Sequence, residues 1–184
     1  MGTWVALDAD SKLEISYFVG NRYATYKRIF MNDLSGRLKN RVQLTPDGFR
    51  AYLEAIEESF GADIDFAQLV KMYGKPIEGE LRYSPGQHTG AVKTPITGNP
   101  KMKYNSTSYV GRQNLAMRMN MTRFTRLTNA FSKKVENQPN AGALHFIYYN
   151  YCRIHKTLRV SPLMATGIED HLFSVEDLAK FIWC

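Results

Sequence analysis

The sequence predicts a mixed α/β domain in which helices pack on a small β-sheet. Two segments near the start, 4–10 and 12–19, alternate apolar with other residues at period two, which is typical of β-strands. Turn-forming residues from Asp8 to Lys12 join them into an antiparallel hairpin. Later segments repeat apolar residues every three or four positions, which is the helical period. This alternation of strands and helices favours a sheet covered by helices.

Two helices and a short strand are expected after the hairpin. The first helix covers 23–38, and a short strand over 41–46 ends at Pro46, because proline cannot continue a strand ladder. An acidic helix follows over 49–60. The apolar face of the first helix is expected to carry four side chains: Tyr26, Ile29, Phe30 and Leu34.

The middle of the chain is rich in residues that interrupt regular structure. Residues 64–73 alternate again and predict a strand or a short helix. Residues 74–108 contain four prolines and five glycines, so they predict a long loop with one strand near 92–96.

The clearest helical pattern covers residues 109–136, with an apolar stripe on one side and a basic stripe on the other. The apolar stripe comprises Val110, Met117, Met121, Phe124, Thr128, Phe131 and Val135. The basic stripe comprises Arg112, Arg123, Arg126, Lys133 and Lys134. An aromatic-rich helix or turn over 141–151 follows, and a short helix over 174–183 is expected to begin at Ser174 as its N-cap, with Asp177 at the third position.

The positive charge of the chain is concentrated in one block. The formal net charge is +7. Residues 91–160 hold 12 Lys and Arg side chains and a single acid, Glu136, whereas residues 1–90 hold 11 basic and 12 acidic side chains. A basic surface of this density attracts phosphate backbones without reading sequence. The charge pattern therefore favours a nucleic-acid partner over a merely solvated surface.

Composition argues against several other classes of protein. The sequence has no run of about 18 apolar residues, so we expect no membrane span. The two cysteines, Cys152 and Cys184, form no zinc-binding pattern and no disulfide framework. The first residues lack the basic and apolar stretches of a secretion signal. A reducing cytoplasm is the expected location.

Four motifs occur along the chain. Residues 149–162 (YNYCRIHKTLRVSP) resemble the "YN..R.H..L...P" tail signature of insertion-sequence transposases and integrases. Residues 108–119 (SYVGRQNLAMRM) resemble a helix, read roughly as "YVERQN", that carries the last catalytic Glu in bacterial DDE transposases of the insertion-sequence-one family. Residues 6–13 (ALDADSKL) and 44–52 (LTPDGFRAY) match the same family. The resemblance covers nearly the whole chain.

The resemblance implies an RNase H-like fold, a mixed sheet flanked by helices that the chain enters after the first strand. Residues 1–168 then form the transposase catalytic-core fragment, with 74–108 as a long loop or insertion. Residues 169–184 form a C-terminal helix. DNA at transposon ends is the implied partner, and self-association or pairing with an intact transposase is implied as well. No membrane partner is expected.

The resemblance also implies that the catalytic carboxylates are incomplete. DDE transposases hold two divalent ions, Mg²⁺ or Mn²⁺, with two Asp and one Glu, and the ions drive phosphoryl transfer. Asp47 matches the second Asp, whereas Gly111 stands at the Glu position and offers no ligand atom. The first Asp belongs to a segment upstream of Met1, because Asp8 and Asp10 suit the hairpin turn better. We therefore expect metal binding and strand transfer to be impaired.

Basic and polar side chains of the two transposase-like motifs and the long helix are the candidate DNA contacts. They are Arg112, Asn114, Arg118, Arg123, Arg126, Lys133, Lys134, Arg153, His155, Lys156 and Arg159. For His155 a structural hydrogen bond is the alternative, and for the aromatic cluster at 146–151 a place in the core is favoured over base stacking.

Three functions remain open from the sequence. The first is a catalytically defective transposase core, and the second is a non-catalytic module that binds DNA or an intact transposase. The third is a decayed gene product without function, since a sheet that lacks an edge-covering strand tends to aggregate.

Overall fold

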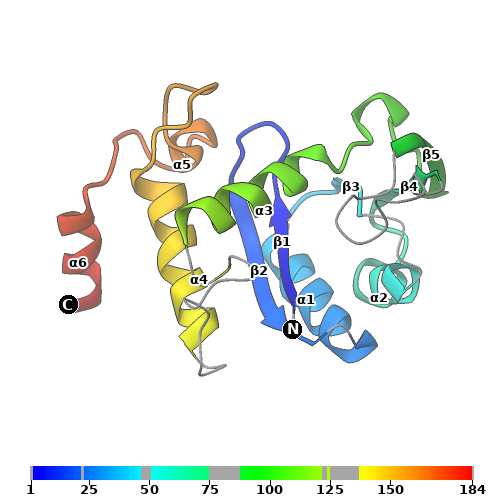
Figure 1. Cartoon of the computed structure of the whole chain (residues 1–184), viewed down its shortest axis with the longest axis horizontal. Coiled ribbons are helices and arrows are strands. Elements are labelled where there is room, and N and C mark those ends of the chain that lie inside the picture. Colours follow the sequence, from blue (N-terminus) through cyan, green and yellow to red (C-terminus); the bar gives the residue numbers. More distant parts are fainter. Residues whose placement is uncertain are drawn as a thin grey trace, which may run out of the picture. The chain divides into compact units, whose positions relative to one another are not determined.

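The computed structural model describes residues 2–21, 23–46, 51–74, 88–121, 124 and 137–183 (Figure 1). They form a mixed α/β fold, as the sequence predicts, but the described strands lie in two small sheets rather than in one. The chain divides into two compact units: Met1–Arg22 with Tyr109–Cys184, here the hairpin unit, and Tyr23–Ser108, here the ribbon unit. The boundary at residue 168 stays a prediction. Among the described residues, no helix combines the length and apolar character that a membrane span requires.

The hairpin unit is built on the predicted N-terminal hairpin. Strand β1 (Gly2–Leu7) pairs antiparallel with β2 (Glu14–Gly20), and helices α3 (Ser108–Asn120) and α4 (Asn137–Ile147) pack on it (Figure 1). The core of this unit joins one buried residue from each of β1, α3 and α4 to three partly buried neighbours. They are Val5, Met117 and Phe146, with Tyr17, Met121 and Phe124 packed against them.

A β-bulge places Glu14 on the core face of the hairpin. The register shifts between Ala6 and Leu7, so that Leu7 lies opposite Glu14 and Ile15 becomes the extra residue. Strict alternation places Glu14 on the face opposite Tyr17. The bulge instead places Glu14 on the same face as Tyr17. Their partners on β1, Leu7 and Val5, are two positions apart and therefore share a face. Glu14 is accordingly only 6% exposed.

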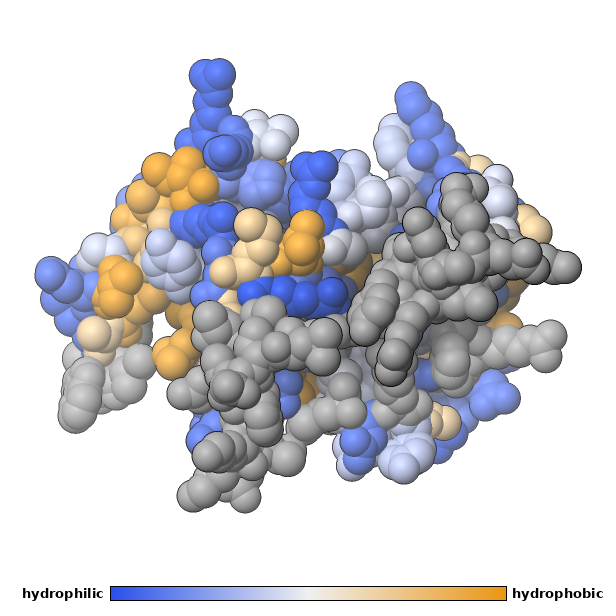
Figure 2. All heavy atoms as spheres, viewed as in Figure 1, coloured by the Kyte–Doolittle hydropathy of each residue, from blue (hydrophilic) through white to orange (hydrophobic). Residues whose placement is uncertain are grey.

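The C-terminal part of the hairpin unit follows α4 through a turn of π-helix, Tyr148–Cys152. Helix α5 (Pro162–Ala165) begins at Ser161, whose side chain accepts the Met164 N–H. Helix α6 (Val175–Trp183) begins with the predicted cap, in which the Asp177 N–H donates to Ser174 Oγ and the Ser174 N–H donates to Asp177. Figure 2 shows hydrophobic residues gathered at the surface over α4 and α5.

The ribbon unit contains two helices and a mixed three-stranded sheet. Helix α1 (Ala24–Arg37), strand β3 (Gln43–Leu44) and helix α2 (Ala51–Phe60) lie within the ranges predicted for them. Strand β4 (Asp65–Tyr73) is a strand rather than the alternative short helix. It pairs parallel with β3 and antiparallel with β5 (His88–Thr97), giving the order β3-β4-β5.

Three details of the predicted elements differ in the structure. Ile29 is 46% exposed, and the buried side of α1 instead includes Lys27 and Met31 beside Phe30 and Leu34. Strand β5 confirms the strand expected near 92–96 but is longer, and a 3₁₀ turn, η1 (Met102–Tyr104), lies in the segment expected to be a loop. Helix α3 ends at Asn120, and most of the predicted continuation to residue 136 lies outside the described residues.

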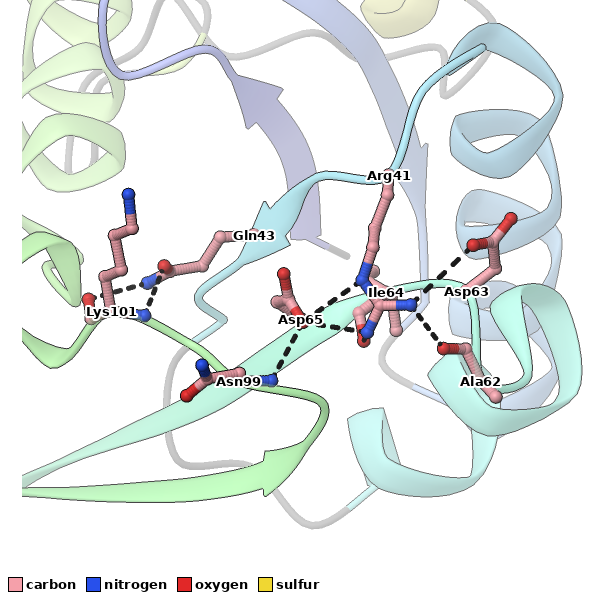
Figure 3. Close-up of polar contacts among 8 residues, drawn as sticks. All are labelled: Arg41, Gln43, Ala62, Asp63, Ile64, Asp65, Asn99 and Lys101. Carbon is pink, nitrogen blue, oxygen red and sulfur yellow. Dashed lines mark hydrogen bonds and ion pairs between the residues drawn. The ribbon is translucent and has the colours of Figure 1, made fainter.

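A clamp of polar contacts fixes the open end of the three-stranded sheet (Figure 3). The Arg41 guanidinium donates to the carbonyls of Ala62 and Ile64 and lies 2.8 Å from Asp65 Oδ1. The same carboxylate oxygen accepts the N–H of Asn99 at 2.9 Å. The clamp therefore ties the loop before β3 to the start of β4 and to the segment that follows β5.

Candidate nucleic-acid interface

The hairpin turn presents Lys12 beside helix α3. Lys12 has φ 61°, and its N–H donates to the Asp8 carbonyl across the turn at 3.1 Å. Asp8 is engaged locally, since its carboxylate accepts both the N–H and the hydroxyl of Ser11. The Lys12 Nζ donates to the Ala9 carbonyl and lies 3.9 Å from the centre of the Tyr109 ring, a cation–π distance. These contacts hold the ammonium group against the first turn of α3.

Helix α3 adds Arg112 to the same region. Arg112 is exposed and follows Tyr109 by three positions, so the two side chains are neighbours on the helix surface. The next residue, Gln113, is buried and donates from its amide to the Glu14 carboxyl. This buried contact fixes the rotation of α3 on the hairpin and thereby the direction in which Arg112 leaves the helix.

The segment after the π-helical turn supplies Arg153 and His155. A tight loop follows, in which the His155 N–H donates to the Val160 carbonyl at 3.0 Å and the Arg159 N–H donates to the His155 carbonyl at 2.8 Å. The Thr157 N–H approaches His155 Nδ1 at 3.4 Å, so Nδ1 is the acceptor and the neutral ring carries its proton on Nε2.

Three cationic side chains converge on His155. Burial lowers the pKa of His155 most, and the positive charges of Lys12, Arg153 and Arg112 lower it further. The charges of these three side chains therefore act on His155, although the four residues come from three separate segments. We call Lys12, Arg112, Arg153 and His155 the basic cluster.

The cationic members of the basic cluster have no acidic partner in the part of the chain that the structure describes. None of the ion pairs found there involves Lys12, Arg112 or Arg153. Bringing like charges together without a counter-charge costs free energy, and a bound anion removes that cost. The cluster is therefore suited to hold a phosphate.

Buried polar groups lie next to the basic cluster. Burial raises the pKa of Glu14 to about 8, and the hydrogen bond from Gln113 offsets part of that rise. Glu14 is therefore largely neutral at physiological pH and does not cancel the positive charge nearby. Burial also raises the pKa of the Tyr149 hydroxyl to about 12. Glu14 is ionised at so high a pH, and its negative charge adds to the rise.

Asn150 of the tail motif has a structural role at the β-bulge. Its side-chain oxygen accepts the Glu14 N–H at 3.0 Å, and its amide donates to the Glu14 carbonyl at 2.9 Å. This pair of bonds imitates a strand partner for Glu14, which lies next to the extra residue of the bulge. It places Arg153, three residues later, next to the hairpin. The tail motif thus links the hairpin turn to the cationic loop.

Other predicted contacts lie apart from the basic cluster or outside the described residues. On α3, Asn114 and Arg118 share a stripe with Gly111, and Arg118 points about 120° away from Arg112 around the helix axis. Lys156 and Arg159 are exposed on the loop that holds His155. Five predicted site residues lie outside the described residues: Asp47, Arg123, Arg126, Lys133 and Lys134.

The side chains of the described residues do not fit the divalent-metal site of a DDE enzyme. Gly111 offers no ligand, and a Cβ built there meets nothing within 4 Å. Glu14 is buried and protonated near neutral pH, so it is no substitute carboxylate. Among the described residues, the only group of three potential ligands is Glu169, Asp170 and His171. These three consecutive residues lie near the C-terminus, and Asp170 and His171 are exposed. No metal-dependent step follows from these groups.

Sequence reasoning missed two residues of this region. Lys12 was assigned only to the turn, because nothing in a linear sequence places it next to Arg112, a hundred positions later. Glu14 was not singled out, because a bulge leaves no clear local signal in the alternation of residues.

Comparison of the chain with models of protein families, with characterised protein sequences and with solved structures gave no significant match.

Proposed function

We propose that this chain is a transposase-type core that binds DNA through the basic cluster and does not itself cut or join strands. The observation that carries the proposal is the convergence of Lys12, Arg112, Arg153 and His155 without an acidic partner among the described residues. Three cationic side chains and an imidazole N–H are donors suited to phosphate oxygens. Such contacts position a DNA backbone without reading its sequence.

The resemblance of four segments to insertion-sequence-one transposases supports the choice of DNA over other anions. Two of these segments, 108–119 and 149–162, supply three of the four cluster residues. We extend the proposal to an RNase H-like ancestry for the fold and to a bacterial cytoplasmic location. The absence of a ligand atom at Gly111 supports the loss of strand transfer, because DDE chemistry uses three carboxylates.

The test is duplex binding and its salt dependence. A labelled 30-base-pair duplex is titrated with the wild-type chain and with Arg112→Ala/Arg153→Ala, and anisotropy is followed at several salt concentrations. The variant is expected to bind at least about tenfold more weakly, and the slope of log K against log salt is expected to fall by about 2, since each lost phosphate contact removes about 0.9. The matched control, Lys39→Ala/Lys180→Ala, has the same net charge and changes exposed lysines elsewhere.

Equal effects of the two double variants would show that only total charge matters and would contradict the proposal. The catalytic part is tested by incubating a labelled DNA end with the chain and Mn²⁺. No cleavage or joining is expected. Strand transfer by the unaltered chain would overturn the assignment of Gly111.

A further inference from the structure

The distal part of β4 and β5 forms a two-stranded ribbon whose two faces differ. β3 pairs with β4 only at Asp65 and Phe66, whereas β5 pairs with β4 as far as Tyr73. Side chains that are paired across the strands, or two positions apart, share a face. Leu69, Lys71 and Tyr73 of β4 therefore lie on one face with Lys93, the partner of Leu69.

The opposite face of the ribbon carries aliphatic side chains. Val70 and Met72 of β4 lie there with Val92, the partner of Val70, and their exposed fractions lie between 39% and 52%. Aliphatic and cationic side chains are thus separated by the strand period. The cationic face can be considered as a surface of its own.

The 3₁₀ turn η1 extends the cationic face. Lys93 Nζ donates to the Met102 carbonyl at 3.1 Å, which brings η1 alongside the ribbon on this side. Lys103 and Tyr104 follow directly, and Tyr104 is 63% exposed. Figure 3 shows the Lys101 side chain extending away from the strands, while its backbone is held by Gln43.

The resulting surface, here the lysine–tyrosine face, consists of Lys71, Tyr73, His88, Lys93, Lys103 and Tyr104. Tyr73 is 60% exposed and packs edge-on against the His88 ring at 5.9 Å. The described residues 66–74 and 88–121 contain no Asp or Glu. Among the described residues of this unit, the acids lie on α1, on α2 and in or beside the Arg41 clamp. The face is cationic and carries two exposed tyrosine rings, Tyr73 and Tyr104.

We propose that the lysine–tyrosine face binds single-stranded nucleic acid, with the lysines on phosphates and the Tyr73 and Tyr104 rings stacked on bases. Exposed rings between cationic side chains are the features by which proteins hold single strands without sequence preference. A duplex keeps its bases stacked on one another and offers no free base for these rings. The six residues from His88 to Lys93 extend over about 16 Å, a span that a few nucleotides bridge.

This inference goes beyond the proposed function, because it concerns the other unit and another form of nucleic acid. The test uses the full chain and a labelled 20-nucleotide oligothymidylate, with the 30-base-pair duplex measured in parallel. Tyr73→Leu/Tyr104→Leu is expected to weaken oligothymidylate binding at least about tenfold, because leucine keeps the apolar bulk and loses the stacking surface. Duplex binding is expected to stay within about twofold of wild type.

Two matched variants separate stacking from folding. Tyr73→Phe/Tyr104→Phe keeps both rings and is expected to bind oligothymidylate within about twofold of wild type. Tyr23→Leu changes a tyrosine that is 70% exposed outside the face and is expected to have no effect.

Lys71→Gln/Lys103→Gln tests the phosphate contacts. It is expected to lower the salt slope for the single strand by about 1.4, since each contact contributes about 0.7.

The proposal is overturned if the unaltered chain does not bind oligothymidylate, or if the leucine variant binds it like wild type. Equal losses on duplex and single strand, or equal losses in the leucine and phenylalanine variants, would also overturn it. Failure of the proposed function is distinguishable, because it appears as duplex binding that is insensitive to Arg112→Ala/Arg153→Ala.

Discussion

At the scale of single residues, burial changes the charge of Glu14. The β-bulge turns its carboxyl toward Gln113, and burial raises its pKa to about 8 from an ordinary 4.5. In the unfolded chain the carboxyl ionises near 4.5, so the folded state binds the extra proton between these two pH values. Stability is therefore full below pH 4.5 and falls as the pH rises toward 8.

This linkage predicts the behaviour of Glu14→Gln. As the pH rises from 4.5 to about 8, the wild-type chain is expected to lose up to about 1.4 kcal/mol of unfolding free energy per pH unit. The variant has no carboxyl at this position and is expected not to show this loss. Glutamine keeps an oxygen that accepts the Gln113 amide, so the variant loses no hydrogen bond there. Urea denaturation from pH 5 to 9 measures the difference. Parallel pH profiles for the two proteins would show that Glu14 is not the titrating group.

Two helical glycines, Gly111 and Gly142, differ in the space around them. A Cβ at Gly111 meets nothing within 4 Å, whereas a Cβ at Gly142 lies 3.2 Å from the Tyr17 ring. Gly111→Ala is therefore expected to stabilise the chain by about 1 kcal/mol, the helix-propensity difference between the two residues. Gly142→Ala is expected to gain less or to destabilise. Thermal melting compares them, and a destabilised Gly111→Ala variant would mean that this part of α3 is packed more closely.

At the scale of elements, the clamp around Arg41 depends on Gly98. Gly98 has φ 71°, and a Cβ there would collide with the side chains of Asp65 and Arg41 and with the Ile64 carbonyl. Gly98→Ala is expected to destabilise by more than about 1 kcal/mol, because left-handed backbone alone costs an L-residue that much. Gly90→Ala, also in this region of the chain and with open space around it, is the control. Similar melting temperatures for the two variants would show that the clamp can rearrange around the added methyl group without destabilising the chain.

The elements that the sequence predicted well are those with local signals. The hairpin follows from alternation and turn residues, and the start of α6 follows from the reciprocal contacts of Ser174 and Asp177, which lie three positions apart. Helix α1 was predicted, but its buried side was rotated, since tertiary packing places Met31 rather than Ile29 inward. The length of β5 was missed because its pairing with β4 spans residues that carry many turn formers.

At the scale of the whole molecule, long-range proximity was the information that the sequence lacked. Arg112, Arg153 and His155 were predicted as separate DNA contacts, whereas their convergence with Lys12 depends on how α3 and the tail loop pack on the hairpin. The charge block over residues 91–160 predicted the partner class, yet its side chains are shared between two units. The hairpin unit holds the basic cluster and the ribbon unit holds the lysine–tyrosine face.

The chemistry of the two surfaces suits different forms of nucleic acid. The basic cluster offers cationic donors and few exposed rings beyond Tyr109, which suits the backbone of a duplex. The lysine–tyrosine face offers exposed rings, which suit unpaired bases. Each proposal is tested by variants in one unit, so the two outcomes are independent.

The central claim, that the basic cluster holds a DNA phosphate, is tested most directly at His155. The His155 ring proton is followed by NMR from pH 5 to 8, alone and with the 30-base-pair duplex. Without DNA, its pKa is expected below the ordinary 6.5, because burial and three neighbouring cations disfavour the charged ring. A bound phosphate compensates those cations and is expected to raise the pKa of His155. An unchanged pKa of His155 in the presence of saturating duplex would contradict the account.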